Sequence, residues 1–295
     1  MKDILITGGT GMVGKHLQKI LPDAYYVGSE YELTEWNETV ALFENTRPKR
    51  VIHLAAKVGG IQDNIEKPAE YFDDNILINT NVVNMCKKYK VERFTAILST
   101  CIYPDKVDRY PMTEEDMFLG PPTKTNFSYA YAKRCMAVQT EAYNKQYGTK
   151  WNYIIPCNLF SELDNFENEK KMHFITSLVK KIKNSNGNIN LLGTGKPLRQ
   201  FIYAEDLARV IKEVIDKDIT ENFNIAPDWN YSINEMTNKA LDVLKVKAEI
   251  VYTNPELDGQ YRKDVSSKKL KKILPNFKFT KFEEGIKKVY DKISQ

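Results

Sequence analysis

Tyr129 and Lys133 are spaced four residues apart in a segment that is rich in helix-forming residues. Positions i and i+4 share one face of a helix, about 6 Å apart at Cβ. A nearby ammonium favours the phenolate, so we expect Lys133 to lower the pKa of Tyr129 from its ordinary value of about 10. Ser99 follows the apolar run 94–98, and its hydroxyl could share a substrate oxygen with the phenol. These three side chains predict proton transfer to or from one oxygen of a bound substrate.

A glycine-rich turn at residues 8–14 joins the apolar run 4–7 to an amphipathic segment at 12–20. Glycines 9, 11 and 14 satisfy G-x-G-x-x-G in a strand-turn-helix context, which indicates a dinucleotide site. Such glycines let the backbone approach a pyrophosphate at the positive end of the helix. After the next predicted strand, Ser29 stands where an Asp would select NAD or an Arg would select NADP. The residues alone therefore leave the choice of cofactor open.

Short apolar strands alternate with longer helices through the first half of the chain. The predicted strands span residues 4–7, 24–27, 51–54, 94–98 and 152–155, and the predicted helices span 12–20, 40–45, 69–89 and 129–147. This alternation is typical of a parallel sheet with helices on both faces. We therefore predict a Rossmann-type, doubly wound α/β fold, in which the glycine turn and Ser99 lie at the ligand-binding edge of the sheet.

The alternation fails after Pro156. Residues 162–171 hold six charged side chains among ten, which indicates a surface loop. Beyond it we expect a helix at 173–183 and strands at 189–192 and 249–252, while residues 200–203, 205–215 and 222–225 could rejoin the sheet. We therefore expect a dinucleotide-binding domain at 1–160 plus about 200–230. A smaller C-terminal α/β substrate-binding domain would comprise 161–199 and 231–295.

The composition is that of an ordinary globular protein, with 42% hydrophobic and 28% charged residues. A net charge of +4 is too small to indicate nucleic acid or an anionic membrane as a partner. No apolar stretch is long enough to cross a bilayer and the first residues lead into the glycine turn, so we expect a cytoplasmic protein. The four cysteines show no C-x-x-C spacing and the three histidines no metal motif. We expect no disulfide, no metal, and structural roles for His16 and His53.

Together these motifs resemble the extended short-chain dehydrogenase/reductase superfamily, in its NAD-dependent epimerase/dehydratase branch that acts on nucleotide sugars. The similarity spans nearly the whole chain, and its matching segments are residues 6–14, 53–60, 98–105, 129–133, 193–199 and 258–263. The most specific segments are 57–60 and 99–104. Within the branch, the chain is most similar to NADPH-dependent epimerase-reductases of GDP-4-keto-6-deoxy-D-mannose.

This resemblance implies a role for each reactive side chain. Tyr129 would protonate the C4 oxygen while NADPH reduces C4, Ser99 would polarise that oxygen, and Lys133 would anchor the nicotinamide ribose. Cys101 and His173 match the family's epimerisation pair. Hydrogens at C3 and C5 are acidic because they flank the C4 ketone, and inversion needs a base on one face and an acid on the other. A thiol and an imidazole, with ordinary pKa values of about 8.5 and about 6.5, suit these tasks near neutrality.

The resemblance also implies binding residues and partners. Cofactor contacts would come from Gly8, Gly9, Thr10, Gly11, Met12, Val13, Gly14, Ser29, Leu54, Ala55, Ala56, Leu98, Tyr129, Lys133, Pro156, Asn158, Leu159 and His173. Nucleotide-sugar contacts would come from Ser99, Thr100, Cys101, Asn158, Lys181, Leu192, Arg199, Asp258 and Lys263. The cations at 181, 199 and 263 fit a diphosphate. The expected cofactor is NADPH, with NADH less favoured, and the expected assembly is a homodimer in which helices 69–89 and 129–147 pair across a two-fold axis.

Because of two departures from the family pattern, the exact sugar and nucleobase of the substrate stay open. Ser161 and Glu162 stand where the family usually has Gly-Pro, and Leu192 stands where it often has Trp. Another NDP-4-keto-6-deoxy sugar, including a UDP-2-acetamido-2,6-dideoxy sugar, is therefore an alternative substrate. Further alternatives are an NAD-dependent NDP-sugar 4-epimerase and a non-catalytic dinucleotide sensor. A sensor would typically lose Tyr129 or Lys133, and both are present.

Overall fold

A six-stranded parallel sheet dominates the computed structural model, which describes residues 2–166 and 172–294. Its strands, in the spatial order β10-β5-β4-β3-β1-β2, are β10 (Phe223–Ile225), β5 (Asn152–Pro156), β4 (Arg93–Ile97), β3 (Arg50–His53), β1 (Ile4–Thr7) and β2 (Tyr25–Val27). All neighbouring strands pair in parallel. The chain reverses its direction of travel across the sheet between β1 and β3, and such switch points bind ligands in doubly wound folds. The predicted fold class is confirmed.

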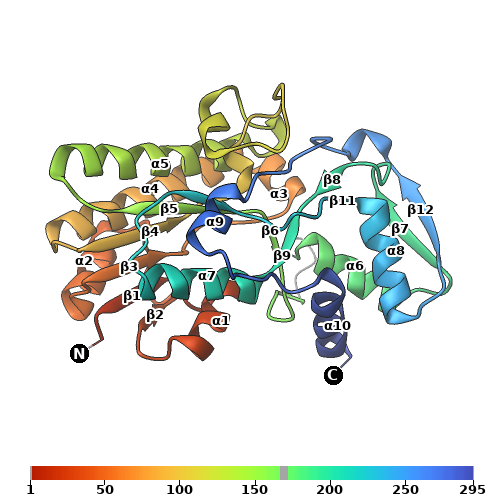
Figure 1. Ribbon diagram of the computed structural model, residues 1–295, viewed down its shortest axis with the longest axis horizontal. Coiled ribbons are helices and arrows are strands. Elements are labelled where there is room, and N and C mark those ends of the chain that lie inside the picture. Colours follow the sequence, from red (N-terminus) through yellow and green to blue (C-terminus); the bar gives the residue numbers. More distant parts are fainter. Residues whose placement is uncertain (1, 167–171, 295) are drawn as a thin grey trace.

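Helices cover both faces of this sheet (Figure 1). One face carries α2 (Trp36–Thr46), α4 (Pro68–Lys88) and α5 (Phe127–Tyr147), and α4 packs along α5. The other face carries α1 (Met12–Ile20) and α7 (Ala204–Asp216), which also pack on each other. The sheet is therefore buried on both sides, as its apolar strand sequences require.

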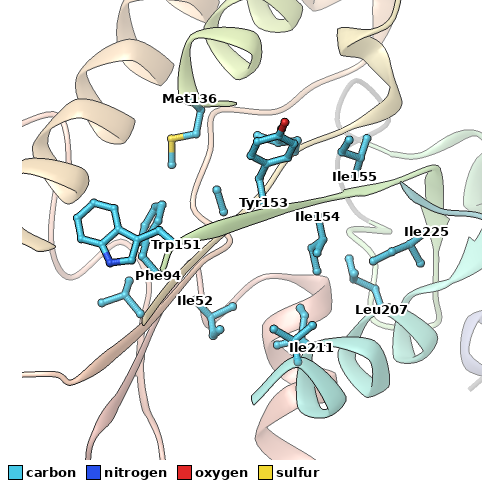
Figure 2. Close-up of a cluster of buried hydrophobic side chains, with 14 of the residues drawn as sticks. Ile52, Phe94, Met136, Trp151, Tyr153, Ile154, Ile155, Leu207, Ile211 and Ile225 are labelled. Atoms are coloured by element: carbon cyan, nitrogen blue, oxygen red, sulfur yellow. The ribbon is translucent and has the colours of Figure 1, made fainter. Parts of the chain in front are cut away.

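Strand β5 shows how the sequence builds this core. Successive residues of a strand point to opposite faces. In Figure 2, Tyr153 extends toward Met136 of α5, whereas Ile154 extends toward Ile211 and its neighbours on α7. Tyr153 is 5% exposed and Ile154 is completely buried. Because both faces are covered, residues 153–156 of β5 form a continuous apolar run instead of an alternating one.

The second half of the chain adds a smaller set of elements beside the sheet (Figure 1). Three two-stranded sheets pair β6 (Asn158–Phe160) with β9 (Phe201–Tyr203), β7 (Asn188–Leu192) with β12 (Glu249–Thr253), and β8 (Leu198–Arg199) with β11 (Tyr231–Ser232). The helices are α6 (Phe174–Lys183), α8 (Ile233–Leu244), α9 (Lys268–Ile273) and α10 (Phe282–Ile293). Residues from α6, β7, α8 and α10 form a second hydrophobic cluster, which includes Val179, Ile189, Met236 and Ile286.

Short helical turns complete the structure. They are α3 (Ile61–Glu66), η1 (Thr100–Ile102), η2 (Glu114–Phe118), η3 (Lys124–Asn126) and η4 (Pro255–Leu257). Arg134 of α5 donates its Nε–H to the carbonyl of Ile102, which fastens η1 to α5. This bond holds the segment after β4 against the helix that carries Tyr129 and Lys133.

Three expectations from the sequence were wrong. The segment 200–203 does not rejoin the central sheet: β10 occupies the edge beside β5, and β9 pairs with β6 instead. Helix α2 begins at Trp36, four residues before its predicted start. Glu162 was expected in a surface loop, yet its side chain is only 18% exposed because Tyr203 and Ser161 donate hydrogen bonds to it. Residues 167–171 of that loop lie outside the described residues.

Candidate active site

In the glycine turn after β1, neighbouring backbone packs so closely that no side chain fits at Gly8 or Gly14. Gly8 has φ +69°, and a Cβ there would lie 2.7 Å from the amide nitrogen of Ala55. A Cβ on Gly14 would lie 2.2 Å from the carbonyl oxygen of Gly9. Gly11 is the N-cap of α1 and has no side chain to cap it, so the first N–H groups of the helix remain available to an anion. These features fit the pyrophosphate of a dinucleotide.

Apart from His173, the other predicted cofactor contacts lie at the carboxyl edge of the sheet or directly beyond it. Leu54, Ala55 and Ala56 directly follow β3, Leu98 directly follows β4, Pro156 ends β5, and Asn158 and Leu159 belong to β6. Thr10 is exposed, and Met12 and Val13 are partly exposed, whereas Gly9 is buried. Ser29 is exposed beyond β2, next to Glu30, whose carboxylate accepts the Gly28 N–H at 2.8 Å. Doubly wound folds bind ligands in a crevice at this edge, and candidates that follow β1, β2, β3, β4 and β5 lie there.

The reactive trio predicted from the sequence comes together beside this crevice. Tyr129 and Lys133 lie in the first two turns of α5, and Ser99 is the N-cap of η1. The Ser99 side chain lies close enough to the phenol of Tyr129 to influence its ionisation. Lys133 donates to the carbonyl of Ile97 at 3.0 Å, and its Nζ lies 6.0 Å from the Tyr129 ring centroid.

The expected effect of Lys133 on Tyr129 was wrong. Burial raises the pKa of Tyr129, and the neighbouring Cys101 side chain raises it further, while the hydrogen bond with Ser99 acts in the opposite direction. Burial also lowers the pKa of Lys133 to about 8, since an ammonium loses its hydration there. Tyr129 is therefore a phenol that keeps its proton at neutral pH, as a proton donor must.

Cys101 lies in η1, where several polar groups surround its sulfur. The Nζ of Lys263 is 3.0 Å from Cys101 Sγ. Burial opposes ionisation of the thiol, but the charge of Lys263 and hydrogen bonds from Ser99, Lys263 and Asn126 outweigh it and lower the pKa of Cys101. Sequence reasoning missed Asn126 and assigned Lys263 to a diphosphate. The one signal for Asn126 in the sequence was its position, three residues before the start of the predicted helix at Tyr129.

Arg199 lies close enough to Cys101 and Asp258 to interact with both electrostatically. Burial lowers the pKa of Arg199, although the negative side chains of Cys101 and Asp258 act in the opposite direction. Asp258 accepts hydrogen bonds at 2.6 Å from both the N–H and the hydroxyl of Thr194. Asp258 thus fastens the glycine loop at 193–195.

The remaining predicted residues are more dispersed. His173 is exposed and is the N-cap of α6, and its Nδ1 lies 2.8 Å from Oδ1 of Asp164, a carboxylate that sequence reasoning missed. Lys181 donates to the carbonyl of Asn190 at 2.9 Å, Leu192 is 60% exposed, and Thr100 is buried. Within the described ranges, no hydrogen bond joins His173 or Lys181 to Cys101.

The other two histidines are part of the core. His53 is buried between Thr7 and Asn79, and burial lowers its pKa to about 3. His16 is buried with its Nε2 at 2.7 Å from Ser161 Oγ. All four cysteines are free. In the part of the chain that the structure describes, no cluster of His, Cys, Asp or Glu could hold a metal ion, and no helix has the length and apolar character of a membrane span.

A phenol that keeps its proton, placed beside a dinucleotide crevice, defines a class of protein: an NAD(P)-dependent enzyme that acts on a carbonyl or hydroxyl carbon. Residues 4–226 match the family model of the NAD dependent epimerase/dehydratase family. The chain belongs to this family, which confirms the resemblance inferred from its motifs.

The chain is also similar to individual proteins and to solved structures within this family. The chain is 36% identical over 301 residues to GDP-L-fucose synthase of Dictyostelium discoideum, covering 97% of this chain and 93% of the relative. It is 34% identical to a probable GDP-L-fucose synthase of Drosophila melanogaster, with 97% and 95% coverage. A crystal structure of a GDP-L-fucose synthetase from Naegleria fowleri bound to NADP matches with a TM-score of 0.88 at 33% identity, covering 100% of this chain and 93% of that one.

Proposed function

We propose that the chain is an NADPH-dependent 3,5-epimerase and 4-reductase that converts GDP-4-keto-6-deoxy-D-mannose into GDP-L-fucose. The observation that carries this proposal is the ionisable thiol of Cys101 in the same site as the protonated phenol of Tyr129. A plain 4-epimerase or a dinucleotide sensor has no use for such a base. Near-full-length similarity to proteins named GDP-L-fucose synthase supports the same substrate.

Residues of the larger part of the chain would hold the cofactor. The glycine turn and the N-terminus of α1 would bind the pyrophosphate, Lys133 would bind the nicotinamide ribose, and Ser29 would face the 2′-phosphate. When bound, the nicotinamide supplies the hydride that reduces C4. We assign residues 1–160 and about 200–230 to the cofactor. Residues 161–199 and 231–295, with Arg199 as the main diphosphate ligand, would bind the nucleotide sugar.

Epimerisation needs a base and an acid on opposite faces of the sugar. Cys101 thiolate takes the proton from C3 or C5, and the C–H electron pair moves into an enolate whose oxygen accepts hydrogen bonds from Tyr129 and Ser99. His173 gives a proton to the other face of the same carbon, and solvent then restores both groups. Asp164 holds Nδ1 of His173, so Nε2 would be the nitrogen that gives the proton.

Reduction uses the same oxygen. As C4 gains the hydride, the Tyr129 phenol transfers its proton to O4 and Ser99 stabilises the charge that develops there. The raised pKa of Tyr129 keeps this proton in place until the ketone can take it. The phenolate that remains is reprotonated from solvent.

The proposed assembly is a homodimer formed through α4 and α5. These two helices pack together and present exposed apolar side chains: Phe72 and Leu77 on α4 are 38% and 46% exposed, and Tyr131 and Val138 on α5 are 38% and 51% exposed. A second copy would cover them by forming a four-helix bundle. The cytoplasmic location stays a prediction of the sequence.

The test mixes the protein with NADPH and GDP-4-keto-6-deoxy-D-mannose and follows the reduced nicotinamide band. A reductase consumes NADPH stoichiometrically, a sensor leaves the band unchanged, and a 4-epimerase needs no added cofactor. Tyr129→Phe should remove most of the reduction and retain NADPH binding. Cys101→Ser should impair deuterium exchange at C3 and C5 more than hydride transfer to an already epimerised substrate, and equal loss of both would contradict the assigned roles.

A further inference from the structure

Lys263 has an unusual partner for a lysine. Its Nζ donates to Cys101 Sγ at 3.0 Å. Among the described residues, no carboxylate forms an ion pair with Lys263, although both of its sequence neighbours are paired with each other. The positive charge of this side chain therefore acts on the thiol instead of being neutralised by an acid.

The backbone around Lys263 explains this orientation. The segment forms bridges between Leu198 and Arg262 and between Met112 and Val265. Arg262 and Asp264 pair at 2.6 Å, on one face of the segment. In extended backbone, alternate side chains point to opposite faces, so Lys263 projects away from that ion pair and toward η1. Two elements far apart in the sequence thus hold the ammonium against the sulfur.

We propose that Lys263 is a positioning residue for epimerisation: its ammonium pairs with Cys101 Sγ and keeps this side chain as a thiolate, the form that can remove a proton from carbon. The inference rests on the proposed function only in that Cys101 is the base. The proton that Cys101 takes from the sugar returns to solvent, and none is transferred to or from Lys263.

The other groups that face the sulfur support this division of roles. Ser99, Asn126 and Tyr129 are neutral, and Arg199 is the second cation that influences Cys101. Arg199 also lies beside Asp258, which offsets part of its charge. Lys263 is therefore the cation with the most direct effect on the thiol, and the burial of Cys101 would leave it protonated if that charge were removed.

Alkylation of Cys101 by iodoacetamide tests the pairing without relying on activity. A Cys135→Ser background removes the exposed cysteine, and Cys86 and Cys157 are buried. The rate of Cys101 alkylation, measured by mass spectrometry across pH, reports the thiolate fraction. We expect Lys263→Met to raise the midpoint by about 1 to 3 pH units and to slow alkylation at neutral pH about tenfold or more.

Matched variants separate charge from structure. Lys263→Arg should keep most of the low pH midpoint of Cys101 alkylation. Lys263→Gln keeps a hydrogen-bond donor but has no charge, so its midpoint should be raised as in Lys263→Met. Lys272→Met removes an exposed lysine on α9 and should leave the midpoint unchanged. An unchanged midpoint in either the Met or the Gln variant would overturn the proposal, and either variant suffices if the other fails to fold.

Deuterium exchange at C3 and C5 distinguishes this inference from the proposed function. In Lys263→Met, exchange should fall at neutral pH and recover at alkaline pH, where the thiol ionises unaided. If Cys101 is not the base, the Cys101→Ser variant still exchanges deuterium at C3 and C5. In that case the midpoint of Cys101 alkylation still shifts in Lys263→Met. If Lys263 does not act on Cys101, Cys101→Ser loses exchange while Lys263→Met keeps the wild-type profile.

Discussion

Gly14→Ala is the most direct perturbation of the cofactor site. The added Cβ would lie 2.2 Å from the carbonyl oxygen of Gly9 and 2.5 Å from its carbonyl carbon. Both atoms belong to backbone, so no side-chain rotation relieves the overlap. Because real Cβ atoms essentially never lie closer than 3.0 Å to such atoms, α1 and the turn must separate by roughly 1 Å.

This displacement sets the expected loss of affinity. A hydrogen bond of about 2.9 Å that lengthens by roughly 1 Å no longer meets the geometric limit. A hydrogen bond to a charged group contributes about 1.5 to 3 kcal/mol, so loss of one pyrophosphate contact should weaken NADPH binding about 10-fold to 150-fold. The loss of folding stability should be smaller than this loss of binding free energy. Alanine is favoured over glycine within a helix by about 1 kcal/mol, which offsets part of the cost of the overlap.

Fluorescence titration of NADPH against the variant provides the assay, and thermal unfolding provides the control for folding. Gly120→Ala is the matched substitution, because its Cβ would meet only Pro104 at 3.4 Å, an ordinary contact. We expect Gly120→Ala to bind NADPH as the wild type does. Wild-type affinity in a folded Gly14→Ala variant would refute the idea that close backbone packing forms the pyrophosphate site.

Further predictions concern the supporting structure. Arg134→Met removes the bond to the Ile102 carbonyl that fastens η1, so exchange and reduction should both slow while NADPH affinity, measured by titration, stays unchanged. Val138→Asp should convert the proposed dimer into a monomer in sedimentation velocity, without loss of NADPH binding. Buried His53 stays neutral down to about pH 3, whereas the unfolded chain takes up this proton below about pH 6.5. The free energy of unfolding should therefore fall with decreasing pH across that window, by up to about 1.4 kcal/mol per pH unit, and urea titrations of His53→Gln should show a shallower slope.

Local patterns were enough to predict the frame of the site. The strand at Ile4–Thr7, the glycine turn and the helix at Met12–Ile20 follow from apolar periodicity and from glycine spacing, and the structure has them at these bounds. The positions of Tyr129 and Ser99 follow in the same way, because a helical spacing and a strand end are both visible in the sequence. These features depend on neighbours within a few residues.

What the sequence did not reveal depends on long-range packing. Lys263 reaches Cys101 across 162 positions of the chain. The pairing of β9 with β6 likewise depends on which strand fills the edge of the sheet. The direction of the Tyr129 pKa shift was wrong because spacing indicates the distance to Lys133 but not the burial, which is the larger effect.

The position of Cys101 links the two halves of the proposed reaction. In the proposed reaction a thiolate at this position, stabilised by Lys263, acts as the base for the carbon acids of the sugar, and its negative charge also raises the pKa of Tyr129. The negative charge of Cys101 therefore makes this side chain a base and also helps to keep Tyr129 protonated. In the proposed reaction Cys101 acts on C3 and C5 while Tyr129 acts on the oxygen at C4, so one site would stabilise the enolate during epimerisation and then protonate the alkoxide during reduction, with no need to move the sugar between two centres.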